Sequence, residues 1–156
     1  MLTTVIISIF ANIDHSHRDV RLDLFHWVEW LGSQFELGGL RLDAIKHYSA
    51  SFLRDFIGHI DKTVGKDWFI VGEYWRADAT VLSSYIEYMK SRISLFDVPL
   101  VESFSKTSRG MEQDIRKIFH GSLAVIKPAN AVVSSISVPV DWIRIVTKVT
   151  DFRCKS

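Results

Sequence analysis

The chain alternates between two patterns of apolar residues. In four stretches the apolar positions recur every three or four residues, the spacing that places side chains on one face of a helix. These positions are Val20, Leu24, Trp27, Val28 and Leu31; Phe52, Phe56, Ile60 and Val64; Leu82, Tyr85, Ile86 and Met89; and Met111, Ile115, Ile118 and Phe119. The expected N-caps are Ser49 or Ser51 and Asp78, and the expected stops are Gly65 and Gly121. We therefore expect a helix around each set.

Short apolar runs typical of strands separate these stretches, at residues 39–42, 69–72 and 95–100. The expected order is helix, strand, helix, strand, helix, strand, helix. Alternation of this kind favours a parallel α/β sheet with right-handed crossovers and helices on its outer side. We expect a curved sheet of about three strands with two unpaired edges, and such edges favour self-association.

The composition is that of an ordinary soluble protein, with 47% hydrophobic residues, 24% charged residues and a formal net charge of +1. This balance gives no reason to expect nucleic acid as a partner. The apolar run at residues 5–10 lacks the basic start and cleavage site of a signal peptide and is too short to span a membrane. We therefore expect no membrane partner and a location inside the cell rather than outside it. The single cysteine, Cys154, excludes an internal disulfide.

Two of the predicted strands end in a carboxylate. Asp43 follows the first run, and Glu73 follows the second, thirty positions later. Thirty residues make about one strand-helix unit, which brings consecutive parallel strand ends side by side, where the active sites of such folds lie. Two carboxylates placed in this way suggest glycoside hydrolysis.

The neighbours of the two carboxylates predict different protonation states. Side chains alternate along a strand, so Arg41 shares a face with Asp43, and an adjacent cation lowers the pKa of a carboxyl and keeps it ionised, as a nucleophile requires. Glu73 lacks such a neighbour in the sequence and precedes Tyr74 and Trp75, an apolar setting that should raise its pKa and keep a proton for a leaving group. Taken singly, neither segment requires a catalytic role. Arg41 and Asp43 are then better explained as a buried ion pair, and Glu73 as a solvated residue at a strand end.

Taken together, the two segments resemble the α-amylase family, glycoside hydrolase family 13. Residues 39–47, Gly-Leu-Arg-Leu-Asp-Ala-Ile-Lys-His, match each fixed position of the family's second conserved region, and residues 71–75, Val-Gly-Glu-Tyr-Trp, match the third. Residues 95–100 look like the next strand of liquefying-type α-amylases, and residues 12–17 look like their return from the inserted B domain. The resemblance covers about residues 10–131 and is to a fragment of the catalytic barrel of liquefying-type or intracellular fungal-like enzymes.

The resemblance implies a fold and a mechanism. The fold is α/β, a partial TIM (β/α)8 barrel with roughly strands four to six and flanking helices, in which the barrel is not closed. Asp43 would be the nucleophile, Glu73 the general acid and then base, and Arg41 the residue that orients Asp43. The implied reaction is retaining double displacement on an α-1,4-glucan such as starch or glycogen.

The same resemblance implies contacts with substrate and metal. Lys46 and His47 would contact sugar beyond the scissile bond, and Trp75 is the candidate to stack on a sugar face. A structural calcium would be bound by Asn12 and the carbonyl of His47, with Asp14 as a further oxygen ligand. Asn in place of the more usual Asp predicts weak binding, and the alternative that residues 12–14 form only a turn stays open. For the other tryptophans we expect core packing, at Trp27, Trp30 and Trp68.

The chain also departs from the family pattern. The third catalytic carboxylate belongs to an Asn-His-Asp that should follow residues 130–132, and there the chain reads Val-Ser-Ser-Ile-Ser-Val-Pro. Residues 136–140 and 143–145 alternate like strands without a helix between them. Either they form a short β-hairpin or they come from an altered reading frame or retained intron, and the abrupt end of the resemblance favours the second. We therefore divide the chain into a partial barrel, residues 1–132, and a divergent tail, residues 133–156.

Two classes of function follow. The first is an α-amylase-type hydrolase, truncated and of uncertain activity. The second is a non-catalytic glucan-binding protein or a remnant of an α-amylase. These motifs do not distinguish the hydrolase from a transglycosylase of the same family.

Overall fold

The computed structural model describes residues 13–111, 114–133, 135–136 and 143–144. These residues form two compact units. One comprises the described residues up to Glu36 together with Tyr48–Lys66, and the other comprises Leu37–His47 together with the described residues from Asp67 onward. Both candidate catalytic carboxylates belong to the second unit.

The first unit is a pair of helices, α1 (Arg18–Gln34) and α2 (Ala50–Thr63). Phe25 of α1 stacks on His59 of α2, with ring centroids 4.5 Å apart. An ion pair of Arg21 with Asp55 and a hydrogen bond between Glu29 and His59, each 2.7 Å long, link the same helices. Both predicted helices are confirmed, and so is the cap of the second, because the Ser49 hydroxyl accepts a hydrogen bond from the backbone N–H at position 52.

Two of the three tryptophans expected in the core are not there. Trp27 and Trp30 of α1 are 47% and 54% exposed, whereas Trp68 is buried as expected, at 8% exposure. The helical spacing correctly predicted a core position for Val28, which is fully buried. It also assigned Trp27 to the apolar face of the helix, which is wrong.

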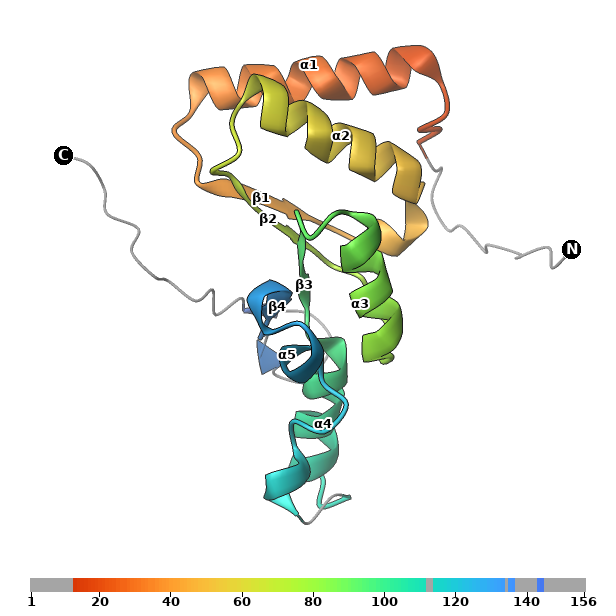
Figure 1. Cartoon of the computed structure of the whole chain (residues 1–156), viewed down its shortest axis with the longest axis vertical. Helices are drawn as coiled ribbons and strands as arrows, with labels where there is room; N and C mark the ends of the chain where they lie inside the picture. The colour runs from red at the N-terminus through yellow and green to blue at the C-terminus, as the bar shows by residue number, and fades with distance from the viewer. Residues whose placement is uncertain (1–12, 112–113, 134, 137–142, 145–156) are drawn as a thin grey trace, which may run out of the picture. The chain divides into compact units, whose positions relative to one another are not determined.

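The second unit is built on a parallel sheet in the order β1-β2-β3-β4, formed by Gly39–Leu42, Phe69–Gly72, Ser94–Phe96 and Ala131–Val132 (Figure 1). The predicted parallel α/β architecture is confirmed. The sheet has one strand more than expected, since two residues of β4 pair with β3. Within the described residues, β1 and β4 are its edges and the sheet is open.

The strand register assigns side chains to the two faces of the sheet. Arg41 is level with Val71, and Val71 with Ser94, so these residues share a face with Phe96, two positions beyond Ser94. Leu95 lies on the other face, where it is fully buried. A truncated barrel predicts that Phe69, Val71 and Leu95, beside Arg41, lack part of their covering. Phe69 is 48% exposed, as this predicts, whereas Val71 is only 5% exposed and Leu95 is buried on the opposite face, so the prediction is wrong for these two.

Helix α3 (Ala79–Tyr88) follows β2 and contacts β3 and the short helix α5 (Leu123–Ile126). The predicted N-cap is confirmed, since the Asp78 carboxylate accepts from the backbone N–H groups of Thr80 and Val81 at 2.9 and 3.3 Å. Leu82, Ile86 and Met89 are buried, as the helical spacing required.

The sequence placed the next two elements wrongly. Strand β3 ends at Phe96, and the residues expected to continue it form the first turn of α4 (Val98–Ser108). Pro99 lies in that first turn, where its missing N–H costs no helical hydrogen bond. Gly110, at a φ of +70°, ends α4 in a conformation that favours glycine.

Among the described residues of the region where a fourth amphipathic helix was expected, the structure has a short 3₁₀ turn, η2 (Ile115–Lys117). Of the predicted apolar face, Ile118 is buried, while Met111, Ile115 and Phe119 are 71%, 68% and 50% exposed. Another 3₁₀ turn, η3 (Pro128–Asn130), leads into β4. The Asn130 amide holds that turn in place by donating to the carbonyls of Ser91 and Ile93 at 3.1 and 2.9 Å.

A single buried carboxylate joins the elements around β3. Asp97 is fully buried and caps α4 by accepting from the N–H of Leu100 at 3.0 Å. It also accepts from the N–H groups of Leu123 and Ala124, at 3.0 and 2.7 Å, and so caps α5 as well. Its own N–H donates to the carbonyl of Val132 in β4 at 2.9 Å. One side chain therefore fixes the starts of two helices beside the sheet.

In the tail, β5 (Ser135–Ile136) pairs antiparallel with β6 (Ile143–Arg144). The other predicted strand positions, Val138, Val140 and Ile145, lie outside the described residues, so the choice between a hairpin and a sequence without an evolved fold stays open. Across the described residues, none of the helices combines the length and apolar character needed to cross a membrane.

Replacing Asp97 should destabilise the fold. Asp97→Ala leaves three backbone N–H groups without an acceptor, and we expect it to lower the free energy of unfolding by about 3 kcal/mol or more in urea denaturation. Asp97→Asn keeps one acceptor oxygen but turns a donor toward the N–H of Ala124, so a loss of about 1–3 kcal/mol is expected.

Ser122→Ala is the matched control. The Ser122 hydroxyl is fully buried and has no hydrogen-bond partner among the described residues, since Asp97 occupies the N–H groups that a cap at this position would use. Its removal should leave stability unchanged or raise it. A loss at Ser122→Ala equal to that at Asp97→Ala would contradict this account of the two caps.

Candidate functional site

The ends of β1 and β2 are held together by backbone hydrogen bonds. Leu42 is level with Gly72 in the parallel register, so Asp43 and Glu73 each follow the last paired residue of their strand. The Glu73 N–H donates to the carbonyl of Leu42 at 2.8 Å, and the N–H of Ile45 donates to the carbonyl of Glu73 at 3.0 Å. The two carboxylates therefore leave adjacent strand ends, as the sequence predicted.

A sharp turn follows the first carboxylate. Ala44 has a φ of +49°, a left-handed conformation that costs a non-glycine residue free energy. The turn leads into the 3₁₀ helix η1 (Ile45–His47), whose Ile45 is fully buried. There is no room for a side chain at position 72 beneath this turn, because a Cβ on Gly72 would lie 2.5 Å from Cδ1 of Ile45. Close packing and backbone bonds together fix the direction of Asp43.

Arg41 connects the two carboxylates. Its Nη2 donates to Oδ1 of Asp43 at 3.0 Å and to Oε2 of Glu73 at 2.9 Å. The two acceptor oxygens are therefore no farther apart than the sum of these distances. The guanidinium lies over the ring of Phe96, 5.6 Å from its centroid. The sequence predicted a contact of Arg41 with Asp43 alone. It did not reveal the contact with Glu73, because that contact is created by strand pairing and not by proximity in the sequence.

The environment of Glu73 raises the pKa of its carboxyl above the ordinary glutamate value. Burial is the main cause, since the side chain is only 19% exposed, and the hydrogen bond with the Asp43 carboxyl acts in the same direction. Arg41 opposes both effects without reversing them. The direction agrees with the sequence-based expectation, although the sequence had supposed that no cation was near. Asp43, by contrast, is 72% exposed.

The expected sugar contacts lie close to these groups in the sequence. Lys46 and His47 are exposed on η1, directly after the turn at Ala44. Trp75 follows Glu73 by two residues and is 41% exposed. All three side chains are accessible to a ligand.

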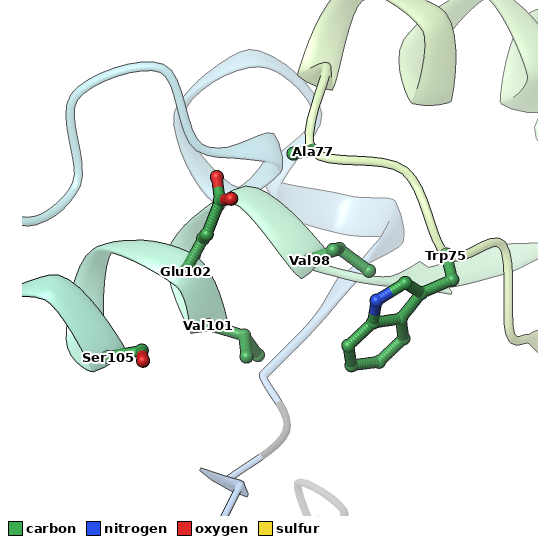
Figure 2. Close-up of a pocket in the computed structure, with 6 residues that line it drawn as sticks. All are labelled: Trp75, Ala77, Val98, Val101, Glu102 and Ser105. Atoms are coloured by element: carbon green, nitrogen blue, oxygen red, sulfur yellow. The ribbon is translucent and has the colours of Figure 1, made fainter.

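Trp75 also forms one wall of a pocket that the sequence did not reveal. The pocket has a volume of about 220 Å³ and is completed by Ala77 and by four residues of α4, Val98, Val101, Glu102 and Ser105 (Figure 2). Sequence reasoning missed it because residues 98–100 were assigned to a strand. The helical spacing of Val98, Val101, Glu102 and Ser105 is the pattern that would have placed them on one face.

The described residues do not assemble the calcium site that the resemblance implied. Asn12 lies outside the described residues. Oδ1 of Asp14 accepts from the N–H and hydroxyl of Ser16 at 2.9 and 2.6 Å, the contacts of a local turn, and they lower the pKa of its carboxyl. In the described part of the chain, no group of three or more His, Cys, Asp or Glu side chains converges as metal ligands would. Calcium binding stays a prediction and takes no part in the mechanism below.

Comparison with known proteins points to one family. The chain is 38% identical over 124 residues to the α-amylase of Bacillus licheniformis, covering 79% of this chain and 24% of that protein. It is 37% identical over 122 residues to the cytoplasmic α-amylase of Escherichia coli K12, covering 78% and 25%. It is 36% identical over 124 residues to the glucan 1,4-α-maltohexaosidase of Bacillus sp. strain 707, again covering 79% and 24%. No family model matches the chain.

The fold gives the same result. A crystal structure of an Anoxybacillus α-amylase superposes with a TM-score of 0.55 and 26% sequence identity, covering 60% of this chain and 20% of that one. The chain spans about a quarter of the length of the curated relatives it matches. Three findings point to the same family: the open parallel sheet, the paired carboxylates at its strand ends, and identities of 36–38% over most of the chain. The chain belongs to the α-amylase family.

Proposed function

We propose that this chain carries the nucleophile and the general acid of a retaining α-amylase-type glycoside hydrolase. The observation that carries the proposal is the bridge made by Arg41, whose single Nη2 bonds both carboxylates at 3.0 and 2.9 Å on adjacent strand ends. Retaining glycosidases hold their two carboxyl groups about 5–5.5 Å apart, and inverting enzymes hold them about 6.5–9.5 Å apart. The limit that the bridge sets on the two bonded oxygens supports the retaining geometry.

In the first half of the reaction, Asp43 attacks the anomeric carbon as a carboxylate. Glu73 gives its proton to the glycosidic oxygen as the bond from carbon to oxygen breaks, so the leaving sugar departs as an alcohol. The raised pKa of Glu73 favours the protonated form that this step requires. Arg41 keeps the Asp43 carboxylate directed toward the sugar.

In the second half, the Glu73 carboxylate takes a proton from a water molecule, which attacks the anomeric carbon and releases Asp43. Two inversions restore the original anomeric configuration, and each group returns to its starting protonation state. Arg41 contacts Glu73 as well, so it stabilises the charged form of Glu73 that the second half requires.

The proposed substrate is an α-1,4-glucan. The name of the Bacillus sp. relative, glucan 1,4-α-maltohexaosidase, describes a bond of this kind in its own substrate. In this proposal Lys46 and His47, exposed after the turn at Ala44, contact the sugar beyond the scissile bond, and Trp75 offers an exposed aromatic face. Hydrolysis and transglycosylation share these residues and differ only in whether water or a sugar hydroxyl attacks in the second half.

One observation favours the alternative, a non-catalytic glucan-binding protein or remnant. Strand β4 ends at Val132, and the Asn-His-Asp of the family does not follow it in the sequence. Groups that act as a catalytic unit are not additive, so the loss of a third carboxylate removes far more than its share of the rate. The experiment below separates the two functions.

We expect the chain to hydrolyse dye-linked amylose measurably but far more slowly than the Bacillus licheniformis enzyme, with the activity abolished in Asp43→Asn. The sharper readout is covalent. With an activated maltosyl fluoride, Glu73→Gln should accumulate a maltosyl adduct on Asp43, because fluoride leaves without an acid whereas release of the adduct requires the base. Mass spectrometry of a peptide that contains Asp43 detects the added mass.

Asp43→Asn in the Glu73→Gln background is the control and should carry no adduct. Proton NMR of the first product released by the unmodified chain should show the α-anomer. A β-anomeric first product would contradict retention. Absence of both turnover and adduct would favour the non-catalytic alternative.

The pKa of Glu73 should respond in opposite directions to its two neighbours. Carbon-13 NMR titration should place it above the ordinary glutamate value, lower in Asp43→Asn and higher still in Arg41→Gln. The folded state binds the extra proton, so the Glu73 contribution to stability is fully present below the unfolded pKa and declines as pH rises through the raised one. In urea denaturation, the free energy of unfolding of Glu73→Gln should lack this decline with rising pH. A lower pKa of Glu73 in Arg41→Gln would contradict the assignment of Arg41 as the group that opposes the raised pKa.

We also propose that the chain self-associates, as the sequence suggested. Within the described residues the sheet has unpaired edges at β1 and β4, and Met111 and Ile115 expose 71% and 68% of their surface. Size-exclusion chromatography with light scattering should give a mass above that of the monomer. Met111→Lys and Ile115→Lys together should shift the distribution toward monomer, whereas a sharp monomer peak for the unmodified chain would contradict the proposal.

A further inference from the structure

The level of the sheet that carries the two carboxylates continues onto β3. Gly72 is level with Leu95 in the parallel register. The residues that follow them, Glu73 and Phe96, therefore lie level at the ends of β2 and β3, and Asp43 lies level with Glu73 at the end of β1. Three neighbouring strands thus bring two acids and one aromatic ring to the same level on one face of the sheet.

Hydrogen bonds alone fix the Arg41 guanidinium only in part. Both of its bonds to the carboxylates come from one nitrogen, Nη2, at 3.0 Å to Asp43 and 2.9 Å to Glu73. A fork in which two nitrogens bond one carboxylate gives a geometric restraint that a single shared donor lacks. The Arg41 side chain is also 33% exposed, so water competes for its donors. A further contact that holds the cation would make the bridge more rigid.

The ring of Phe96 makes such a contact. Its centroid is 5.6 Å from Cζ of Arg41, within the distance of about 6 Å at which a cation and an aromatic face attract each other. The ring also covers one side of the guanidinium and excludes water there. A lower local dielectric strengthens the interaction of the cation with both carboxylates.

Phe96 itself has little freedom to move. It is 1% exposed and is the last residue of β3, where it lies level with Val132 of β4. The next residue, Asp97, donates its N–H to the Val132 carbonyl at 2.9 Å and caps two helices with its carboxylate. Close packing leaves so buried a side chain few alternative rotamers. The ring is therefore a fixed support for a cation that is partly open to solvent.

We propose that Phe96 is a positioning residue of the catalytic pair, a fixed aromatic ring that holds the Arg41 guanidinium in its bridge between Asp43 and Glu73. Phe96 acts through Arg41 and not on the substrate, because it is fully buried. The inference rests on the proposed function for the roles of the two carboxylates, but the contact is independent of turnover. It extends the site to β3, beyond the two strand-end motifs.

The test changes the charge distribution of the ring while nearly keeping its shape. A ring-trifluorinated phenylalanine, placed at position 96 of the full chain by nonsense suppression, has a weaker negative face and so attracts a cation less. Carbon-13 NMR titration of Glu73 is the readout, because Arg41 opposes the raised pKa of that carboxyl. A cation that is held less firmly opposes it less. The pKa of Glu73 should therefore rise, though by less than in Arg41→Gln.

Phe96→Leu removes the ring altogether and adds two readouts. The N–H protons of the Arg41 guanidinium, assigned by their absence in Arg41→Gln, should lose the upfield shift that the ring current of Phe96 causes. Combined with Glu73→Gln, Phe96→Leu should slow formation of the maltosyl adduct on Asp43 by about three- to tenfold, because the nucleophile is then directed less well.

Two controls separate this role from core packing in general. The same fluorinated residue in place of Phe56, a ring of α2 that is 5% exposed, alters the core of the other unit and should leave the pKa of Glu73 unchanged. In the Arg41→Gln background, fluorination at position 96 should also leave it unchanged, because the ring then has no cation to hold. Circular dichroism and urea midpoints verify that each variant is folded.

The outcomes are distinguishable from those of the proposed function. A rise in the pKa of Glu73 on fluorination at position 96, absent in the Arg41→Gln background, supports the inference even if the chain turns over no substrate. An unchanged or lower pKa overturns it, even if the adduct forms on Asp43. A rise of equal size in the Arg41→Gln background also overturns it, because Phe96 would then act on Glu73 directly.

Discussion

The parallel pairing of β1 with β2 determines where the two candidate catalytic carboxylates lie. Leu42 is level with Gly72, and reciprocal backbone bonds link Glu73 to Leu42 and Ile45. In a parallel pair both strands end at the same edge, so two residues thirty positions apart emerge as neighbours. A register shift of one residue would turn Asp43 to the other face and leave Glu73 without its partner. The close packing under Gly72 resists such a shift because it leaves no space for a side chain there.

The electrostatics of the site follow from that pairing. Arg41 is brought within hydrogen-bonding distance of both carboxylates, and burial and the Asp43 carboxyl raise the pKa of Glu73 against the influence of the cation. Two acids of the same type thereby differ in exposure, with Asp43 open to solvent and Glu73 mostly covered. This division of environments is consistent with the nucleophile and the acid of the proposed double displacement.

A buried charge, Asp97, organises the part of the sheet around β3 and β4. Asp97 ends β3, caps α4 and α5, and bonds β4 through its own backbone N–H. Because it starts α4 directly after the strand, it turns Val98, Val101 and Glu102 toward the segment that carries Trp75. The candidate catalytic pair thus depends on the ends of β1 and β2, and the pocket beside Trp75 depends on the cap at the end of β3.

The sequence by itself determined most of the alternation of helices and strands, the cap at Asp78, a serine cap at position 49 or 51, and the pair Asp43 and Glu73, because these are encoded by local spacing and by short motifs. It did not determine the start of α4, the strand β4 or the exposure of Trp27 and Trp30, since apolar runs such as residues 95–100 suit a strand and a helix alike. The contact of Arg41 with Glu73, the double cap of Asp97 and the pocket lined by Glu102 join residues far apart in the chain. Only tertiary pairing brings such groups within bonding distance, and so only the folded structure decided them.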